Sequence, residues 1–294
     1  SLSWDQITFI TMQKMNSGVE SFSLLAIPLF ILAGNIMNNG GIALRLVNCA
    51  KVISGRMPGA LAQSNVVANM LFGAISGSGA AAAAAMGGTI GPLEEKEGYD
   101  KNYSTAVNVA SAPVGMLIPP SNTMIVYSSV AGSVSIAALF MAGYIPGILW
   151  GLACMVVLYI YAKKRGYTSS KRYALKEKTK IILEALPCLL MIIIVIGGII
   201  GGIFTATEGA VVAVVYSLIL SLVFYKSIKV SELPKLLMDS AEMTGIIIFL
   251  IGVSSIMSWV MAFTGIPAAI SGVMLGISSN KYVILLIINV ILLI

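Results

Sequence analysis

Long stretches without a charged residue dominate the chain. They comprise 21–44, 57–93, 102–162, 185–207, 209–225 and 243–280. A helix needs roughly 20 apolar residues to cross the hydrocarbon of a bilayer, so 102–162 must cross more than once. The alternation of apolar and polar residues typical of a barrel strand is absent. Because only helices and closed barrels satisfy their own backbone hydrogen bonds in lipid, we predict an all-α integral membrane protein.

Composition strengthens this prediction and excludes several kinds of enzyme. The 294 residues are 58% hydrophobic and 10% charged, whereas soluble domains carry about 25% charged residues. The chain has no histidine, which removes Ser-His and Cys-His catalysis and the commonest metal ligand. Its three cysteines are isolated in sequence, so neither a disulfide framework nor a metal cluster is indicated.

Charge asymmetry predicts which ends of the helices face the cytoplasm. The densest basic segment, 163–180, has eight Lys or Arg residues and one acid, and the positive-inside rule places such segments in the cytoplasm. Two smaller basic groups follow the same rule: Arg45, Lys51 and Arg56, and Lys226, Lys229 and Lys235. With residues 1–20 outside and the amphipathic stretch 42–56 inside, the predicted crossings are 21–39, 103–131, 136–162, 181–203, 208–225 and 243–263.

The segment 58–92 breaks the sequence of simple crossings. It must begin and end in the cytoplasm, because the charged stretch 94–101 follows it. We therefore predict a re-entrant hairpin whose tip is "SGSGA" at 76–80. Non-helical backbone at membrane depth persists only when it is buried in protein or lines a watery cavity, which suits Ser76 and Ser78. The six alanines of 80–85 allow close helix packing.

A second irregularity, "ASAPVGMLIPPSNTM" at 110–124, interrupts the helix 103–131. Three prolines in so short a stretch cannot sit in a regular helix, because each removes a donor and clashes with the preceding turn. Half-helix ends and freed carbonyls coordinate small cations, and helix N-termini favour anions. Ser121, Asn122 and Thr123 are suited to begin the second half as N-cap residues. A simple proline kink is the alternative.

The stretches 24–43 and 246–268 look alike. Each is an apolar helix with a pair of small or polar residues in its middle, followed by Gly-Ile and an amphipathic arm. Since the first crosses inward and the second outward, this is the pattern of an inverted repeat, typical of secondary transporters. Chance similarity between apolar helices is the alternative. On the repeat interpretation, 281–294 matches the first arm of the hairpin, and we expect the chain to be a fragment that ends before a second tip.

Five motifs carry a family resemblance: "SLLAIPLFILAGNIMNNGGIALRLV", "NMLFGAISGSGAAAAAAMGGTIGP", "IPPSNTMIVY", "ALFMAGYIPGILWG" and "GGIFTATEGAVVAVV". In their order and spacing they resemble the large membrane subunit of tripartite ATP-independent periplasmic (TRAP) transporters. The resemblance covers nearly the whole chain, and the tip is more similar to the sialic-acid branch than to the C4-dicarboxylate branch. It implies an elevator-type carrier driven by a sodium gradient. Its implied partners are a periplasmic substrate-binding protein and a small four-helix membrane subunit, fused or separate, in the bacterial inner membrane.

The resemblance also assigns roles to the tip and the broken helix. It implies a Na+ site, with Na+ as the coupling ion, at Ser76, Ser78, Gly115, Leu117 and Pro120. It implies a site for an organic acid at Ser78, Ser121, Asn122 and Thr123. A second sodium site would lie in a second hairpin and a second broken helix, which this chain does not contain.

The same resemblance divides the chain into transport and scaffold parts. The expected transport domain is 58–135, with the hairpin 58–92 and the broken helix 103–131. The expected scaffold comprises 1–57 and 136–242, including the basic loop 163–180. Residues 243–294 would begin the second inverted repeat.

One residue, Ala206, departs from the family pattern, and one acid, Glu208, is a separate candidate for a functional role. Ala206 stands in "FTATEG" where the family usually has proline. Glu208 is an acid inside an apolar region, which makes it a functional candidate, but its place at the head of a helix favours a structural role with the helix dipole.

Other functions fit the sequence less well. A serine hydrolase at the tip lacks histidine and has no lysine between 57 and 93, and a phosphate-binding loop would need Gly-Lys-Ser/Thr after the glycines. A passive scaffold subunit would not need a tip and a break both rich in ligating groups. A sodium-coupled anion symporter that works without a binding protein is the nearest alternative.

Overall fold

The computed structural model describes residues 3–55, 57–132, 134–167 and 174–293. Their regular elements are all helical, with no strand in these ranges, which confirms the predicted all-α class. The chain forms two compact units, Ser21–Ile246 and Ser1–Glu20 with Ile247–Ile294. Three members of the predicted basic groups lie outside the described residues: Arg56, Lys171 and Arg172.

The larger unit contains the hairpin and the broken helix. Its helices are α2 (Ala26–Asn39), α3 (Ile42–Ser54), α4 (Ala60–Ser76), α5 (Gly79–Thr89), α6 (Gly91–Lys96), α7 (Lys101–Ser111), α8 (Val114–Leu117), α9 (Asn122–Ala131), α10 (Ile136–Arg165), α11 (Leu175–Ile200), α12 (Ala206–Ile219) and the first part of α13 (Leu233–Phe263). A turn of 3-10 helix, Phe22–Leu25, precedes α2, and a π-helical turn, Leu220–Phe224, follows α12.

Within the described ranges, five helices are long and apolar enough to cross a membrane, or six when the bent pair Lys101–Leu117 and Asn122–Ala131 counts as one span. They coincide with the six predicted crossings. Two begin six or more residues earlier than predicted, α11 at Leu175 and α13 at Leu233. The reason is that a charge-free stretch marks the part of a helix that lies in lipid, while the helix itself continues through charged turns.

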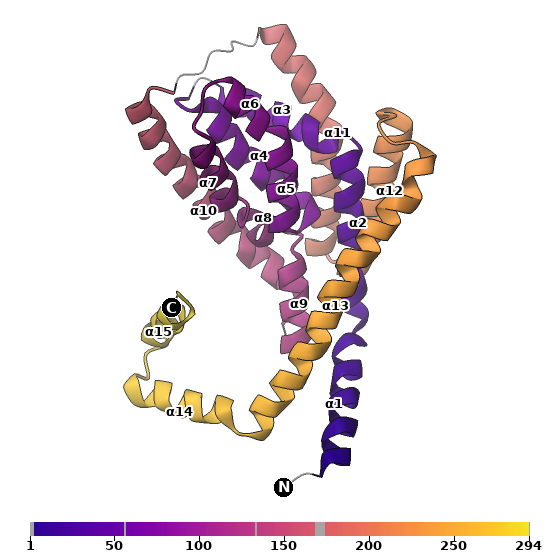
Figure 1. Cartoon of the computed structure of the whole chain (residues 1–294), viewed down its shortest axis with the longest axis vertical. Coiled ribbons are helices and arrows are strands. Elements are labelled where there is room, and N and C mark those ends of the chain that lie inside the picture. Colours follow the sequence, from indigo (N-terminus) through magenta and orange to yellow (C-terminus); the bar gives the residue numbers. More distant parts are fainter. Residues whose placement is uncertain (1–2, 56, 133, 168–173, 294) are drawn as a thin grey trace. The chain divides into compact units, whose positions relative to one another are not determined.

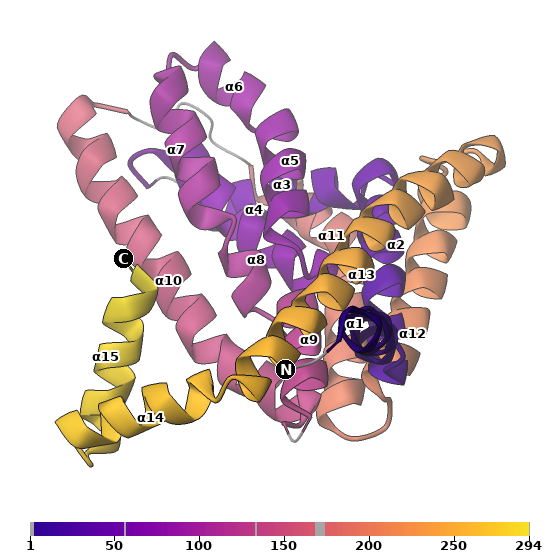
Figure 2. The same cartoon turned by 60° about the horizontal axis from the view of Figure 1, so that its bottom comes forward.

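Helix α4 lies at the centre of the larger unit. It contacts α2, α3, α5, α7, α8 and α10, and α10 with α7 lies on one side of the hairpin while α2 with α12 lies on the other (Figures 1 and 2). Because it is surrounded, even its polar side chains Gln63, Asn65 and Asn69 are buried. The α4 arm of the hairpin is therefore enclosed by other helices, whereas the α5 arm keeps an exposed face at Ala80, Ala84 and Gly88.

Both ends of the hairpin meet the end of α10. The backbone N–H of Gly59, just before α4, donates to the carbonyl oxygen of Tyr167 at 2.9 Å. The ring of Tyr99, just after α6, stacks on the ring of Tyr167 with centroids 4.4 Å apart. The segment 58–92 therefore returns to the end at which it begins, as the charge pattern predicts.

The two stretches of the predicted repeat share a local design. Gly41 has φ +70° between α2 and α3, and Gly265 has φ +73° between α13 and α14 (Ile266–Ile277). Glycine tolerates positive φ without steric cost, so each arm turns sharply away from the preceding helix. The smaller unit also contains α1 (Trp4–Val19) and α15 (Lys281–Leu293). The inverted relation of the two stretches stays a prediction.

Candidate functional site

The hairpin tip consists of the last residue of α4 and the first of α5. Helix α4 ends at Ser76, and Gly77 turns the chain with φ +64°. Ser78 is the N-cap of α5, and its hydroxyl accepts a hydrogen bond from the Ala81 N–H at 3.3 Å. The Ser76 hydroxyl lies 3.4 Å from both the N–H and the carbonyl oxygen of Ser78. The two serines therefore form one polar turn.

The broken helix has three pieces. Helix α7 ends at Ser111, α8 is a single turn, and Ile118 is extended with ψ 122°. This extended backbone is expected before a proline. Ser121 caps α9: its hydroxyl accepts from the Met124 N–H at 3.4 Å and donates to the carbonyl oxygen of Met116 at 2.5 Å. The predicted break and the N-cap role of Ser121 are both confirmed.

The tip and the break are in direct contact. The Asn122 N–H, at the start of α9, donates to the carbonyl oxygen of Gly77 at 3.1 Å. A methyl group added at Gly77 would lie 2.8 Å from the Pro120 carbonyl oxygen, and one added at Gly115 would lie 3.5 Å from the Ser78 carbonyl oxygen. Four of the residues expected around a Na+ ion, Ser76, Ser78, Gly115 and Pro120, therefore lie in one small region.

Other predicted residues lie differently. The Leu117 carbonyl oxygen packs against Gly143 of α10, which places it at the α10 side of the break. Among the residues expected around the substrate, Ser121 and Asn122 are buried while Thr123 is exposed.

One neighbour of the tip was not predicted. Gly34 of α2 packs on Ser76, such that a methyl group added at Gly34 would lie 3.2 Å from the Ser76 Cβ. Ser76 is only 1% exposed as a result of this enclosure. A glycine in the middle of an apolar helix is the sequence signal of such a close approach.

The site offers groups of both polarities. Helices α5 and α9, 11 and 10 residues long, begin beside each other at the tip–break contact, and helix N-termini favour anionic groups. The end of α4 and the freed carbonyls of the break are acceptors suited to a small cation. The Asn122 Oδ1 is buried and has no hydrogen-bond partner among the described residues. Buried polar atoms are normally paired, and an unpaired amide oxygen is suited to a cation or to a hydrogen-bond donor.

Glu208 has a structural role. One of its carboxylate oxygens accepts from the backbone N–H of Thr205 at 2.8 Å, and the Glu208 N–H donates to the Thr205 hydroxyl at 3.2 Å. This reciprocal pair is a capping box at the start of α12. Ala206 is the first residue of α12, the N1 position where proline is common but not required, which accounts for the departure noted above.

We expect Glu208→Gln to retain transport, because the glutamine amide oxygen can still accept from the Thr205 backbone. Thr205→Ala should instead lower the stability of the protein by about 1 kcal/mol, the typical cost of losing a cap. Uptake assays and thermal unfolding of the two variants would check this. A complete loss of uptake in folded Glu208→Gln would contradict the structural role.

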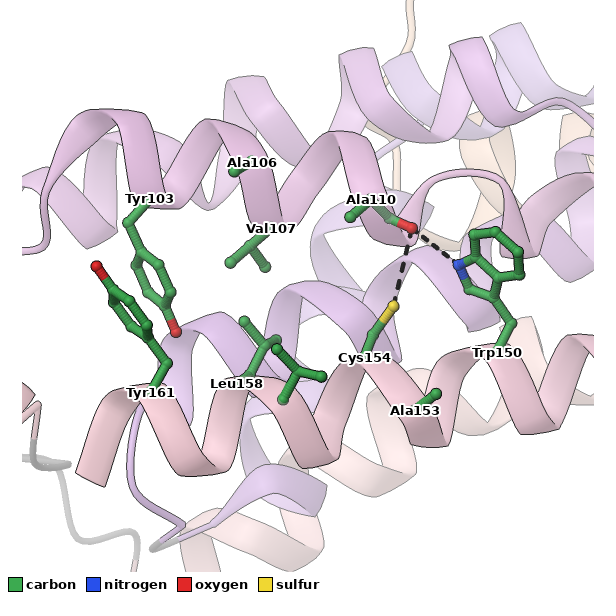
Figure 3. Close-up of a pocket in the computed structure, with 10 residues that line it drawn as sticks. Tyr103, Ala106, Val107, Ala110, Trp150, Ala153, Cys154, Leu158 and Tyr161 are labelled. Carbon is green, nitrogen blue, oxygen red and sulfur yellow. Dashed lines mark hydrogen bonds between the residues drawn. The ribbon is translucent and has the colours of Figure 1, made fainter. Parts of the chain in front are cut away.

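One cavity beside the broken helix is not a polar site. It is a crevice of about 570 Å³ between α7 and α10, lined by Tyr103, Ala106, Val107, Ala110, Trp150, Ala153, Cys154, Val157, Leu158 and Tyr161. Figure 3 shows Trp150 and Cys154 reaching from α10 to the Ala110 carbonyl oxygen, which accepts from the Trp150 ring N–H at 2.9 Å. This bond satisfies a carbonyl in the last turn of α7, where helical partners are lost. The crevice is otherwise apolar and is unsuited to an organic acid.

A helical hairpin whose tip meets a discontinuous helix is an arrangement typical of membrane carriers. Comparison with known families identifies the family to which the chain belongs. Residues 3–294 match the model of the DctM component of the tripartite ATP-independent periplasmic transporters. The chain belongs to this family, as its motifs predicted, and the family fits the expected location in the bacterial inner membrane.

Several curated proteins are similar to the chain over almost its entire length. An uncharacterized protein, YgiK of Salmonella typhimurium, is 53% identical over 98% of this chain and 66% of its own length. The sialic acid TRAP transporter large permease protein SiaM of Vibrio cholerae is 37% identical over 96% of this chain and 66% of its own length. The C4-dicarboxylate TRAP transporter large permease protein DctM of Pseudomonas aeruginosa is 38% identical over 96% of this chain and 66% of its own length. The chain thus spans about two thirds of the length of these relatives.

Proposed function

We propose that the chain is the main part of the large membrane subunit of a sodium-coupled carrier for a small organic acid. A periplasmic binding protein delivers the acid, a small four-helix membrane subunit accompanies the chain, and an elevator movement of 58–135 carries the site across the membrane. The observation that carries the proposal is the hydrogen bond between Asn122 and Gly77. It holds a hairpin tip and a broken helix together, an arrangement typical of ion and substrate sites in secondary transporters.

In this proposal Ser76, Ser78 and the carbonyl oxygens of Gly115 and Pro120 hold Na+, with Leu117 completing the set after a small change at the break. The paired N-termini of α5 and α9, together with Ser121 and Asn122, hold the carboxylate of the acid. The relatives named for sialic acid and for C4-dicarboxylates are similarly close in identity. Both names denote organic acids, which supports the substrate class, and the binding protein chooses among the acids.

Reconstitution of the complete complex in proteoliposomes tests the proposal. Uptake should require both an inward sodium gradient and the loaded binding protein. Uptake that needs sodium but no binding protein would instead identify a simple sodium-coupled symporter. Uptake that needs neither would contradict the proposal.

Substitution at the tip tests the ion site. We expect Ser76→Ala and Ser78→Ala to raise the sodium concentration for half-maximal uptake by about tenfold, equivalent to about 1.4 kcal/mol. The matched control is Ser64→Ala in the same helix, whose buried hydroxyl donates to the Ala60 carbonyl at 2.6 Å. Its sodium dependence should be unchanged. Wild-type sodium dependence in both tip variants would remove these serines from the site.

A further inference from the structure

Glu94 is a buried acid at the base of the hairpin. It lies in the short helix α6, and its side chain is fully buried, whereas its neighbours Glu95, Lys96 and Glu97 are exposed. Three acids so close together, Glu94, Glu95 and Glu97, are typical of a solvated loop, and Glu94 departs from that pattern. Both of its carboxylate oxygens lack a hydrogen-bond partner among the described residues. An ionised carboxylate in such a place is strongly unfavourable unless it is paired.

The Glu94 side chain borders a polar cavity. The cavity has a volume of about 280 Å³ and lies between α4, α5, α6 and α7, with Asn65, Lys101, Ser104 and Asn108 among its lining residues. The Asn65 Nδ2 and the Ser104 Oγ are also buried and without a partner in the part of the chain that the structure describes. A space this large holds several waters. The carboxyl group is therefore enclosed by protein but able to exchange protons with water.

The fixed charges around the cavity do not neutralise Glu94. Lys101, the one cation among its described lining residues, forms an ion pair with the exposed Glu95 at 3.7 Å. Helix α4 presents the neutral Asn65, and α5 presents Gly87. The remaining groups nearby are the acid Glu97 and the phenols of Tyr99 and Tyr103, of which Tyr99 stays neutral because burial raises its pKa to about 12.

We propose that this cavity is a proton-binding site in which Glu94 carries the proton. A protonated carboxyl group has one donor and retains acceptor capacity, so its O–H can donate to cavity water while its other oxygen accepts from the Ser104 hydroxyl. The site is separate from the tip and does not depend on the proposed transport function.

A metal ion fits the cavity less well than a proton. The Asn65 Oδ1 and the Asn108 Oδ1 already face the Asn69 Nδ2 at 3.0 and 3.2 Å. This leaves the carboxyl groups of Glu94 and Glu95 and the hydroxyls of Ser104 and Thr105. Glu95 is paired with Lys101, and Thr105 donates to the Lys101 carbonyl oxygen at 2.9 Å, whereas hard cations such as calcium require six to eight oxygen ligands. The described residues also contain no cluster of three acids, cysteines or histidines that could hold a metal.

The titration of Glu94 should fall near neutral pH. Burial raises the pKa of Glu94 to about 7, the Ser104 hydroxyl opposes this rise, and the charge of Glu97 adds to it. Because the pKa is higher in the folded than in the unfolded chain, the folded state binds the proton more tightly. The stabilisation is therefore complete below pH 4.5, the ordinary pKa, and is lost as the pH rises through about 7.

Infrared difference spectroscopy of the intact chain in lipid nanodiscs would test the proposal. A band of a protonated carboxyl group should disappear between pH 5 and 9 with a midpoint near 7, and the melting temperature should fall over the same range. Both effects should be absent in Glu94→Gln and present in Glu95→Gln, the matched control. A band that persists in Glu94→Gln, or that titrates near pH 4.5, would overturn the proposal.

Ser104→Ala provides a second test that does not depend on whether Glu94→Gln folds. Loss of the hydroxyl that lowers the pKa should move the midpoint to higher pH, and an unchanged midpoint would contradict the proposed partner. A comparison of sodium and choline salts distinguishes a proton-binding site from a metal site. At pH 8, replacing choline chloride by sodium chloride should change the melting temperature of the wild type and of Glu94→Gln equally, because any Na+ bound at the tip is common to both. A rise that Glu94→Gln abolishes would identify a metal site in the cavity instead.

Discussion

Gly73→Val should abolish uptake and lower the melting temperature of the protein. A methyl group at Gly73 would overlap the Cα of Gly115 and lie 3.0 Å from its backbone nitrogen. The clash is between a side chain and backbone, so no side-chain rotation relieves it, and α8 must separate from α4. Overpacking of this kind costs about 1–3 kcal/mol and sometimes more. Because Gly115 is beside Ser78, the same displacement opens the candidate ion site.

The matched control is Gly88→Val in the other arm of the hairpin. Gly88 is exposed, and a methyl group there would have nothing within 4 Å. Both variants place the same β-branched residue in a helix, so their intrinsic helix propensities are comparable. Uptake by proteoliposomes and thermal unfolding should separate them. Normal uptake in Gly73→Val would mean that the contact between α4 and α8 is not required during transport.

The helices and the tip follow from the sequence because local rules determine them. Charge-free length predicts the crossings, and glycine and serine at 76–80 predict the turn now seen at Gly77. Ser121 caps α9 because a hydroxyl after two prolines satisfies a free N–H at a helix start. Charge asymmetry also predicts that the hairpin returns to its own side, a non-local property that follows from counting crossings.

The features that the sequence does not predict are those that depend on which helices become neighbours. The glycine in the middle of α2 signals a close approach, but nothing in the sequence identifies Ser76 as the neighbour of Gly34 or places the Leu117 carbonyl beside Gly143. Glu94 shows the same limit. Three acids within four residues predict a solvated surface, but the short helix α6 turns one of them inward beneath the hairpin.

Replacing Pro119 and Pro120 together by alanine should abolish uptake while the protein still folds. Each proline disfavours helix by about 3 kcal/mol relative to alanine, so the double substitution removes the main reason why 118–121 is non-helical. The bend of 46° between the two halves should then decrease. A continuous helix would use the freed carbonyls internally and would remove the Ser121 cap.

The contact between the broken helix and the tip provides a direct readout of this change. Straightening would break the bond from the Asn122 N–H to the Gly77 carbonyl, so hydrogen exchange in the peptide around 76–80 should accelerate in the double variant. Pro187→Ala is the matched control. That proline lies inside α11, and its carbonyl, which accepts from the Tyr216 hydroxyl at 3.0 Å, is kept by alanine. Wild-type uptake in the double variant, with unchanged exchange at the tip, would mean that residues other than the prolines maintain the break. The carbonyl oxygens proposed as Na+ ligands would then stay free of helical hydrogen bonds without the two prolines.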